Sequence, residues 1–224
     1  MQVAGLFFTS PSKAFAALKE NPVFGLPMFL LLAGSAVLTA WYYGKVDIAW
    51  LQDQMLGQGK LTPEQQQMMA SRMTRGVLLW SSAIAAPIVA GVVLTIGSLY
   101  FLLAGNVTNV RYSFKHWFAF ECWAALPQIV AYIPSFLILA LSTNTQIGAS
   151  ALQPLSLNEL VFHLPMGAKG YSLVSALGLV QIVALWLTYT GLRVWSGRST
   201  LFCLVFTLLP TVLIYGVWAL FAFR

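Results

Sequence analysis

Long apolar stretches alternate with short polar connections along this chain of 224 residues. An α-helix needs about 20 apolar residues to cross the hydrocarbon core of a bilayer. Each stretch reaches that length and is almost free of charged residues. The pattern predicts an all-α integral membrane protein whose five transmembrane helices form one domain over residues 1–224. The predicted spans are 23–43, 76–103, 117–141, 171–192 and 201–221.

The residues before the first span predict a short interfacial N-terminal helix. Ser10 precedes Pro11, an order typical of an N-cap and a first helical position. Ala14, Phe15 and Leu18 then fall on one side of the helix. A helix with one apolar side is expected to lie at the membrane surface.

The first and third connections contain the start signals of short extramembrane helices. Thr62 and Gln65 fit a capping box, and the helix that starts there is expected to continue without a break into the second span. In the third connection, Ser156 and Glu159 predict a short helix over 157–163.

Composition removes the main alternative to a membrane protein. Hydrophobic residues make up 59% of the chain and charged residues 8%, which leaves too little polar surface for a soluble globule. The net charge of +6 comes from Lys and Arg residues scattered singly among the connections. This distribution favours membrane lipids as partners, allows a protein partner at the cytoplasmic face, and argues against nucleic acid.

Catalytic chemistry finds no support in the sequence. The two histidines, His116 and His163, fall on opposite sides of the predicted bundle. The chain contains no nucleophile elbow, no His-Glu-x-x-His motif and no phosphate-binding P-loop. We therefore expect a non-enzymatic protein without a cofactor or a metal site.

The distribution of positive charge predicts the orientation. Six Lys and Arg residues fall on each side of the predicted bundle. On the side of the N-terminus, two connections are short turns that hold two cations each, which raises the charge density there. We therefore expect the N-terminus in the cytoplasm and the C-terminus outside. The two sets are Lys13, Lys19, Arg111, Lys115, Arg193 and Arg198 on the N-terminal side, and Lys45, Lys60, Arg72, Arg75, Lys169 and Arg224 on the other.

Glu121 is the one acidic residue inside a predicted span, and a lone carboxylate at that depth is costly. It lies near the side that carries the basic turns at Arg111 and Lys115. The structural interpretation, which we favour, pairs it with Arg193 or Arg198. The functional interpretation makes it a proton-accepting or cation-binding group.

Polar groups near the middle of the spans are the other candidates for a functional role. Gln128 and Gln181 are expected to bond each other or freed backbone groups, because an unpaired amide there is costly. Alternatively, they line a polar substrate site. Each proline inside a span also leaves a carbonyl that needs a substitute donor. These prolines are Pro87, Pro127, Pro134 and Pro210.

Three blocks of residues carry a resemblance to a known family. They are Pro11, Ser12, Phe15, Glu20 and Pro22 at the opening, Ser113-Phe114-Lys115 within 105–127, and Trp186, Gly191-Leu192 and Ser199 between the last two spans. With these blocks the chain resembles the Yip-one family, the Ypt-interacting proteins and their bacterial relatives. The resemblance implies a five-span membrane protein with a cytosolic N-terminus.

The same resemblance shapes the expected function. Eukaryotic members of the family are associated with Rab GTPases and have long N-terminal regions rich in tyrosine and glycine motifs. This chain has 22 residues before its first span and lacks those motifs, so it resembles the bacterial branch, and a bacterial inner membrane is the expected location. We expect a scaffold or lipid-organising partner that acts through the cytoplasmic basic turns and the interfacial helix. The alternative is a small transporter or channel for an uncharged or lipid-like substrate, with a path near Gln128 and Gln181.

Overall fold

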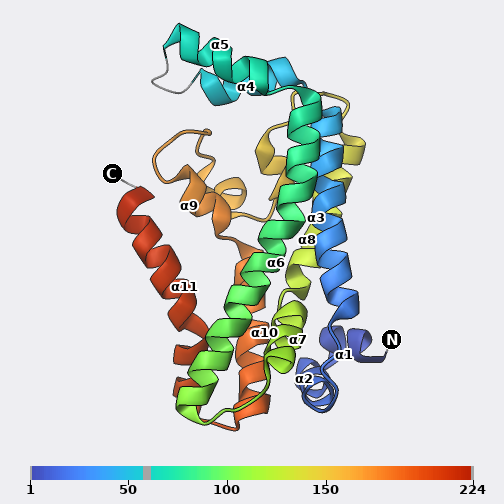
Figure 1. Cartoon of the computed structure of the whole chain (residues 1–224), viewed down its shortest axis with the longest axis vertical. Helices are drawn as coiled ribbons and strands as arrows, with labels where there is room; N and C mark the ends of the chain where they lie inside the picture. Colours follow the sequence, from blue (N-terminus) through green and yellow to red (C-terminus); the bar gives the residue numbers. More distant parts are fainter. Residues whose placement is uncertain (1, 58–61, 223–224) are drawn as a thin grey trace.

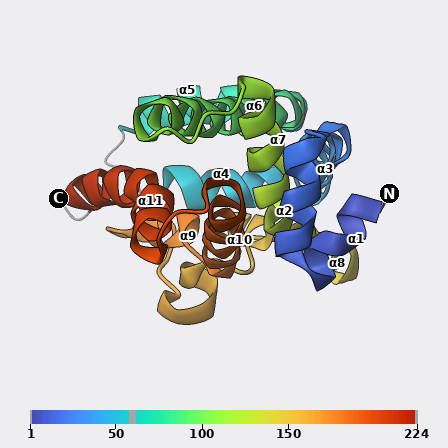
Figure 2. The same cartoon turned by 90° about the horizontal axis from the view of Figure 1, so that it is seen from below.

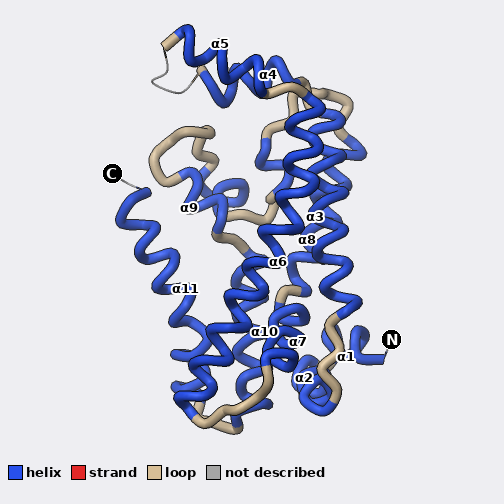
Figure 3. The backbone as a smooth tube through the Cα atoms, in the orientation of Figure 1, coloured by secondary structure: helices blue, strands red, loops and turns tan. Residues whose placement is uncertain are grey.

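The computed structural model describes residues 2–57 and 62–222, and their secondary structure is helical apart from one isolated β-bridge between Ser156 and Gly178. Figure 1 shows the order of the helices, and Figure 3 shows the loops that join them. The long helices are α3 (Gly25–Lys45), α6 (Arg75–Thr108), α8 (Leu126–Leu141), α10 (Leu179–Ser196) and α11 (Thr200–Ala222). The shorter ones are α1 (Gln2–Thr9), α2 (Pro11–Glu20), α4 (Ile48–Leu56), α5 (Pro63–Arg72), α7 (Phe114–Ala124), the 3-10 turn η1 (Ala149–Leu152), the π-helical turn η2 (Asn158–Phe162) and α9 (Tyr171–Ala176).

Within the described residues, four helical segments are long and apolar enough to cross a membrane. They coincide with the first, second, third and fifth predicted spans, which confirms an all-α, multipass membrane protein. The fourth predicted span, 171–192, is not among them, so the count of five spans stays a prediction. The four segments are Gly25–Lys45, Arg75–Thr108, Phe114–Leu141 and Thr200–Ala222.

The predicted fourth span is divided into α9 and α10 at Gly178. The backbone of this glycine is so close to the Leu155 carbonyl oxygen that a Cβ atom would clash with it. Leu179 N–H donates to that oxygen at 3.1 Å, and Leu157 N–H donates to Leu177 O at 2.7 Å. The third connection therefore contacts the helix directly and interrupts it.

A helix break also separates α5 from α6, so the prediction of one continuous helix from Pro63 was wrong. The predicted capping box at Thr62 and Gln65 is present. The helix ends at Arg72, because Thr74 accepts a hydrogen bond from Val77 N–H at 3.4 Å and starts a new helix. As a result α4 and α5 lie across the end of the bundle rather than along it (Figure 1).

The N-terminal helices pack onto the bundle. In α2, Ala14, Phe15 and Leu18 are fully buried, and these are the three residues that the sequence placed on the apolar side. The helix packs against α7 and α10. Seen from below, α1 and α2 lie on one side of the bundle and α11 on the other (Figure 2). The position of α2 relative to a membrane surface stays a prediction.

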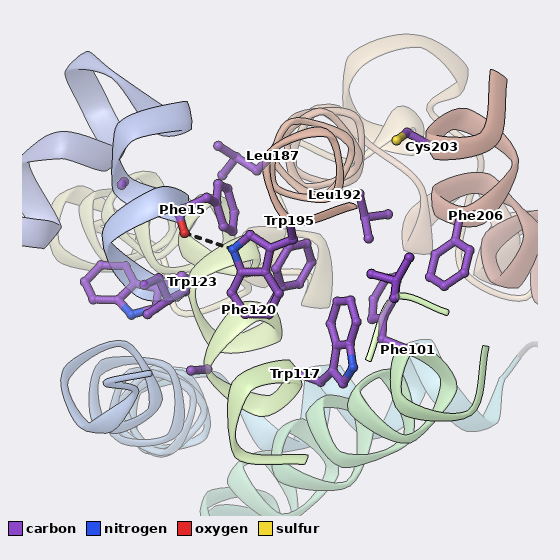
Figure 4. Close-up of a cluster of buried hydrophobic side chains, with 14 of the residues drawn as sticks. Phe15, Phe101, Trp117, Phe120, Trp123, Leu187, Leu192, Trp195, Cys203 and Phe206 are labelled. Atoms are coloured by element: carbon purple, nitrogen blue, oxygen red, sulfur yellow. Dashed lines mark hydrogen bonds between the residues drawn. The ribbon is translucent and has the colours of Figure 1, made fainter. Parts of the chain in front are cut away.

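Buried aromatic rings fill the end of the bundle next to α2, and we call this cluster the aromatic core (Figure 4). The Phe101 and Trp117 rings stack at 5.3 Å between centroids, and the Phe7 and Trp123 rings stack at 4.6 Å. Because α1, α2, α6, α7, α10 and α11 all contribute to it, the cluster fixes the N-terminal helices to the membrane-spanning part. Its rings are Phe7, Phe15, Phe101, Trp117, Phe120, Trp123, Trp195 and Phe206.

A second buried cluster fixes the opposite end of the bundle. Leu38, Tyr42 and Leu139 are at most 3% exposed. The Tyr42 hydroxyl donates to Ile147 O at 2.9 Å, which ties α3 to the third connection. Buried contacts therefore fix both ends of the bundle.

Candidate functional site

One end of the molecule gathers the N-terminal helices and two turns, the one between α6 and α7 and the one between α10 and α11 (Figure 1). We call it the basic end. Glu20 is the only acidic side chain there among the described residues outside the spans. Six cations accompany it: Lys13, Lys19, Arg111, Lys115, Arg193 and Arg198.

The opposite end, which carries α4, α5 and the third connection, has balanced charges. Its described residues include four cations and four acids. Lys60 and Arg224, which the sequence also assigns to this side, lie outside the described residues. The strong excess of positive charge is therefore confined to the basic end. The charged residues at the opposite end are Lys45, Arg72, Arg75, Lys169, Asp47, Asp53, Glu64 and Glu159.

Two arginines of the basic end bind backbone carbonyls rather than a carboxylate. Arg198 donates from Nη2 to the oxygen of Thr108, the last residue of α6, at 2.9 Å. Arg193 donates from Nη1 to Arg198 O at 3.2 Å and to Thr200 Oγ1 at 3.0 Å. A cation at the C-terminus of a helix satisfies free carbonyls and the helix dipole. Both side chains therefore hold the two turns in place.

Glu121 is not brought together with either arginine. In the described part of the chain, 2–57 and 62–222, its carboxylate makes no ion pair and no hydrogen bond. It is half-buried and lies against the backbone of Gly97 in α6, where a Cβ atom would come within 2.9 Å of the carboxylate carbon. The structure thus does not contain the ion pair that the structural interpretation requires.

The two mid-span amides are also unpaired. Gln128 on α8 and Gln181 on α10 are half-buried, and the side chains of these described residues make no hydrogen bond to each other or to the backbone. The helices α8 and α10 nevertheless pack against each other. The predicted helix-to-helix bond is absent from the structure, and the amides remain available to another group.

Exposed cations lie on the turn between α6 and α7 and at the start of α7, and two neighbouring helices hold this turn. Arg111 and Lys115 are exposed, and the Lys19 ammonium lies 5.6 Å from the centre of the Tyr112 ring. The Tyr112 hydroxyl donates to Trp195 O at 2.9 Å. This turn is therefore fixed to both α2 and α10.

The sequence did not identify Trp195 as the centre of this arrangement. Its Nε1 donates to Phe15 O at 2.9 Å and so joins α10 to α2. Gly191, one turn before Trp195, was a sequence signal for this close helix contact, because a Cβ atom there would come within 2.8 Å of the Phe15 ring. Small residues on membrane helices mark close contacts, but the sequence cannot say which helix makes the contact.

Comparison with known proteins agrees with this architecture. A family model described as the Yip1 domain matches residues 4–221. The chain belongs to the Yip1 family. No curated protein and no solved structure gave a match. The family match covers the aromatic core and both basic turns of this Yip1 member.

The remaining candidates for chemistry in this Yip1 member are its titratable and polar side chains. Within the described residues, no group of three or more His, Cys, Asp or Glu side chains could hold a metal ion. Cys122 and Cys203 are buried and free. Near the spans and the basic end, the candidate polar groups are the cations of the basic end and the half-buried side chains of Glu121, Gln128 and Gln181, which have no partner within the described residues.

Proposed function

We propose that this Yip1-family protein is a non-enzymatic membrane scaffold that gathers anionic lipids around its basic end. The observation that carries the proposal is the contrast between the two ends. The basic end has six cations and one acid outside the spans, whereas the described residues of the opposite end are balanced. Each Lys or Arg near an anionic membrane surface contributes about 1 kcal/mol of attraction.

The arrangement of the basic end supports lipid binding in a fixed geometry. Lys13, Arg111 and Lys115 are exposed, whereas Arg193 and Arg198 hold the turns by bonding backbone carbonyls. Arg198 thus fixes the end of α6, directly before the turn that carries Arg111. A fixed backbone beneath the cations lowers the conformational entropy that is lost when they bind a headgroup.

The proposal includes an orientation and a location. We place the basic end at the cytoplasmic face of a bacterial inner membrane, with the C-terminus outside. Short, cation-dense turns favour the cytoplasmic side, and that leaflet supplies anionic headgroups. A protein partner at the same face would meet the same exposed cations.

Photo-crosslinking tests where anionic lipid binds. The purified protein is placed in bilayers that contain a phosphatidylglycerol analogue with a photoreactive group near its headgroup, and a neutral diacylglycerol analogue serves as the control probe. Mass spectrometry should find the phosphatidylglycerol adducts on α2 and on the 109–116 turn, in excess over the neutral probe. Equal labelling of both ends by both probes would refute the proposal.

A second candidate function, a transporter or channel for an uncharged or lipid-like substrate, is supported by the unpaired amides. Gln128 and Gln181 make no side-chain hydrogen bond within the described chain, as is expected of groups that contact a passing substrate. Replacement of either residue by Leu separates the two functions in liposomes. A transporter would lose flux while it keeps its stability, and a scaffold would show no flux to lose.

A further inference from the structure

Two adjoining clefts lie at the opposite end, beneath α4 and beside the third connection. The larger cleft has a volume of about 460 Å³ and the smaller one about 160 Å³. Gly148, Ser150 and Glu159 line both clefts. A carboxylate is therefore part of the wall that the two clefts share, far from the basic end.

The Glu159 carboxylate is held in place by a buried neighbour. Asn158, which is 1% exposed, donates from Nδ2 to Glu159 Oε1 at 3.2 Å. Asn158 is itself fixed by two bonds to the Leu164 backbone, at 2.9 Å and 3.2 Å. The carboxylate thus has a defined position and does not depend on a flexible surface side chain.

No cation of the described chain forms an ion pair with Glu159. Lys45 bonds Ser142, a residue that lines the larger cleft, but its ammonium group donates to the carbonyl oxygens of Leu139 and Ser142 at the end of α8. The Lys45 ammonium group therefore satisfies free carbonyls at the C-terminus of α8. The negative charge in the clefts therefore lacks a counter-charge from the protein.

The smaller cleft adds aromatic and sulfur-containing side chains to this carboxylate. Trp50, Met166 and Tyr171 line it together with Glu159. Aromatic rings attract cations through their electron-rich faces, and grouped rings are the usual means of binding organic ammonium groups. Gln54 and Ser150 supply polar groups along the same walls. A small inorganic cation would instead need several oxygen ligands, and the described residues provide no acidic cluster for one.

The larger cleft lies at the end of a candidate membrane span, where lipid headgroups are expected. It is lined by Ile138, which lies in the last turn of the candidate span Phe114–Leu141, and by Ser142, which directly follows that span. An ammonium group of a lipid headgroup and one of a free amine both have access there.

We propose that the two clefts around Glu159 bind an organic ammonium group, either of an ethanolamine or choline lipid headgroup or of a free amine. The Glu159 carboxylate supplies the counter-charge and Trp50 with Tyr171 the aromatic wall. This site is separate from the basic end, so the test of ammonium binding does not depend on whether the basic end binds anionic lipid.

The test uses the full chain in nanodiscs of phosphatidylglycerol, which lacks an ammonium group. In one arm, free ethanolamine and choline are titrated and binding is read by saturation-transfer NMR. In the other arm, phosphatidylethanolamine or phosphatidylcholine is added to the bilayer and retained lipids are counted by native mass spectrometry. Glu159→Gln removes the charge, and Glu64→Gln, at an exposed site on α5, is the matched control.

Wild-type protein and Glu64→Gln should bind in at least one arm, and that arm identifies the source of the ammonium group. Glu159→Gln should weaken binding about tenfold or more, because a charge-assisted interaction is lost. Trp50→Leu should weaken it about fivefold through the lost ring, and this variant tests the site even if Glu159→Gln does not fold. Unchanged binding in both variants, or no binding by wild type in either arm, would overturn the proposal.

Discussion

Tyr100 on α6 donates its hydroxyl to the carbonyl oxygen of Phe206 on α11 at 2.8 Å. This is the carbonyl that lacks a helical partner, because Pro210, four residues on, has no N–H. The sequence predicted that each proline inside a span would leave a carbonyl in need of a donor, and here the structure supplies the donor. The bond also joins the start of α11 to α6, next to the aromatic core.

We expect Tyr100→Phe to destabilise the protein by about 1 kcal/mol, as is typical for a lost interhelical hydrogen bond in a membrane. Pro210→Ala restores a backbone donor, so Tyr100→Phe should cost less in that background. A double-mutant cycle measured by unfolding in detergent checks this coupling. Equal costs in both backgrounds would show that the hydroxyl does not serve the proline-freed carbonyl.

The absence of an ion pair at Glu121 leads to a second prediction. Because the carboxylate bonds neither Arg193 nor Arg198 within the described chain, Glu121→Gln should not lower stability. Its effect should add to that of Arg193→Gln within about 0.5 kcal/mol. Thermal unfolding of the single and double variants in detergent gives the answer, and strong coupling between the two sites would contradict the structure.

Two glycines on α6 allow a test of the close approach between Gly97 and the Glu121 carboxylate. Gly97→Ala places a methyl group against the Glu121 carboxylate, whereas a methyl group at Gly91 meets nothing within 4 Å. Ala generally stabilises a helix by about 0.5–1 kcal/mol relative to Gly. Gly91→Ala should show that gain and Gly97→Ala should not, unless Glu121→Ala is added and removes the carboxylate that the new methyl group meets.

The docking of α2 depends on Trp195, and this is the third prediction. Trp195→Phe removes the bond from Nε1 to Phe15 O, which should raise the population of undocked α2 about fivefold for a loss of about 1 kcal/mol. Trypsin cleavage after Lys19 reports that population. Trp186→Phe on the same helix, where the side chain is 53% exposed, is the matched control and should leave cleavage unchanged.

Local signals allowed part of the fold to be predicted from the sequence. The capping box at Thr62 and Gln65 involves residues within one helical turn, and the buried side of α2 follows from the spacing of Ala14, Phe15 and Leu18. The sequence missed the break at Gly178, because that break depends on contact with Leu155 in another part of the chain.

The candidate site was harder to predict, because it too depends on contacts between segments that are distant in the sequence. The sequence indicated that Glu121 and the arginines lie near one end, but it could not show that Arg198 would bond the Thr108 carbonyl. Backbone carbonyls at helix ends compete with carboxylates for guanidinium groups, and which one prevails depends on where the turns lie. The clefts around Glu159 likewise arise from segments that are distant in the sequence.

The orientation proposed for the bundle gives a fourth prediction. Cys122 and Cys203 are buried, so an introduced cysteine is the accessible thiol in a labelling experiment. Lys115→Cys should react with a membrane-impermeant reagent only when the cytoplasmic face is open to it, and Gln65→Cys only from the outside. Labelling of Lys115→Cys from the outside would reverse the orientation.

The central claim, that exposed cations of the basic end gather anionic lipid, is tested most directly by counting lipids. Protein is purified in nanodiscs from a bilayer of mixed phosphatidylglycerol and phosphatidylcholine, and the retained lipids are measured by native mass spectrometry. A variant with Lys13, Arg111 and Lys115 replaced by Gln is compared with a control in which Arg72 and Lys169, both exposed at the opposite end, are replaced by Gln. The account predicts that wild type and the control variant retain phosphatidylglycerol in excess and that the triple variant loses this excess, whereas equal retention by all three would contradict it.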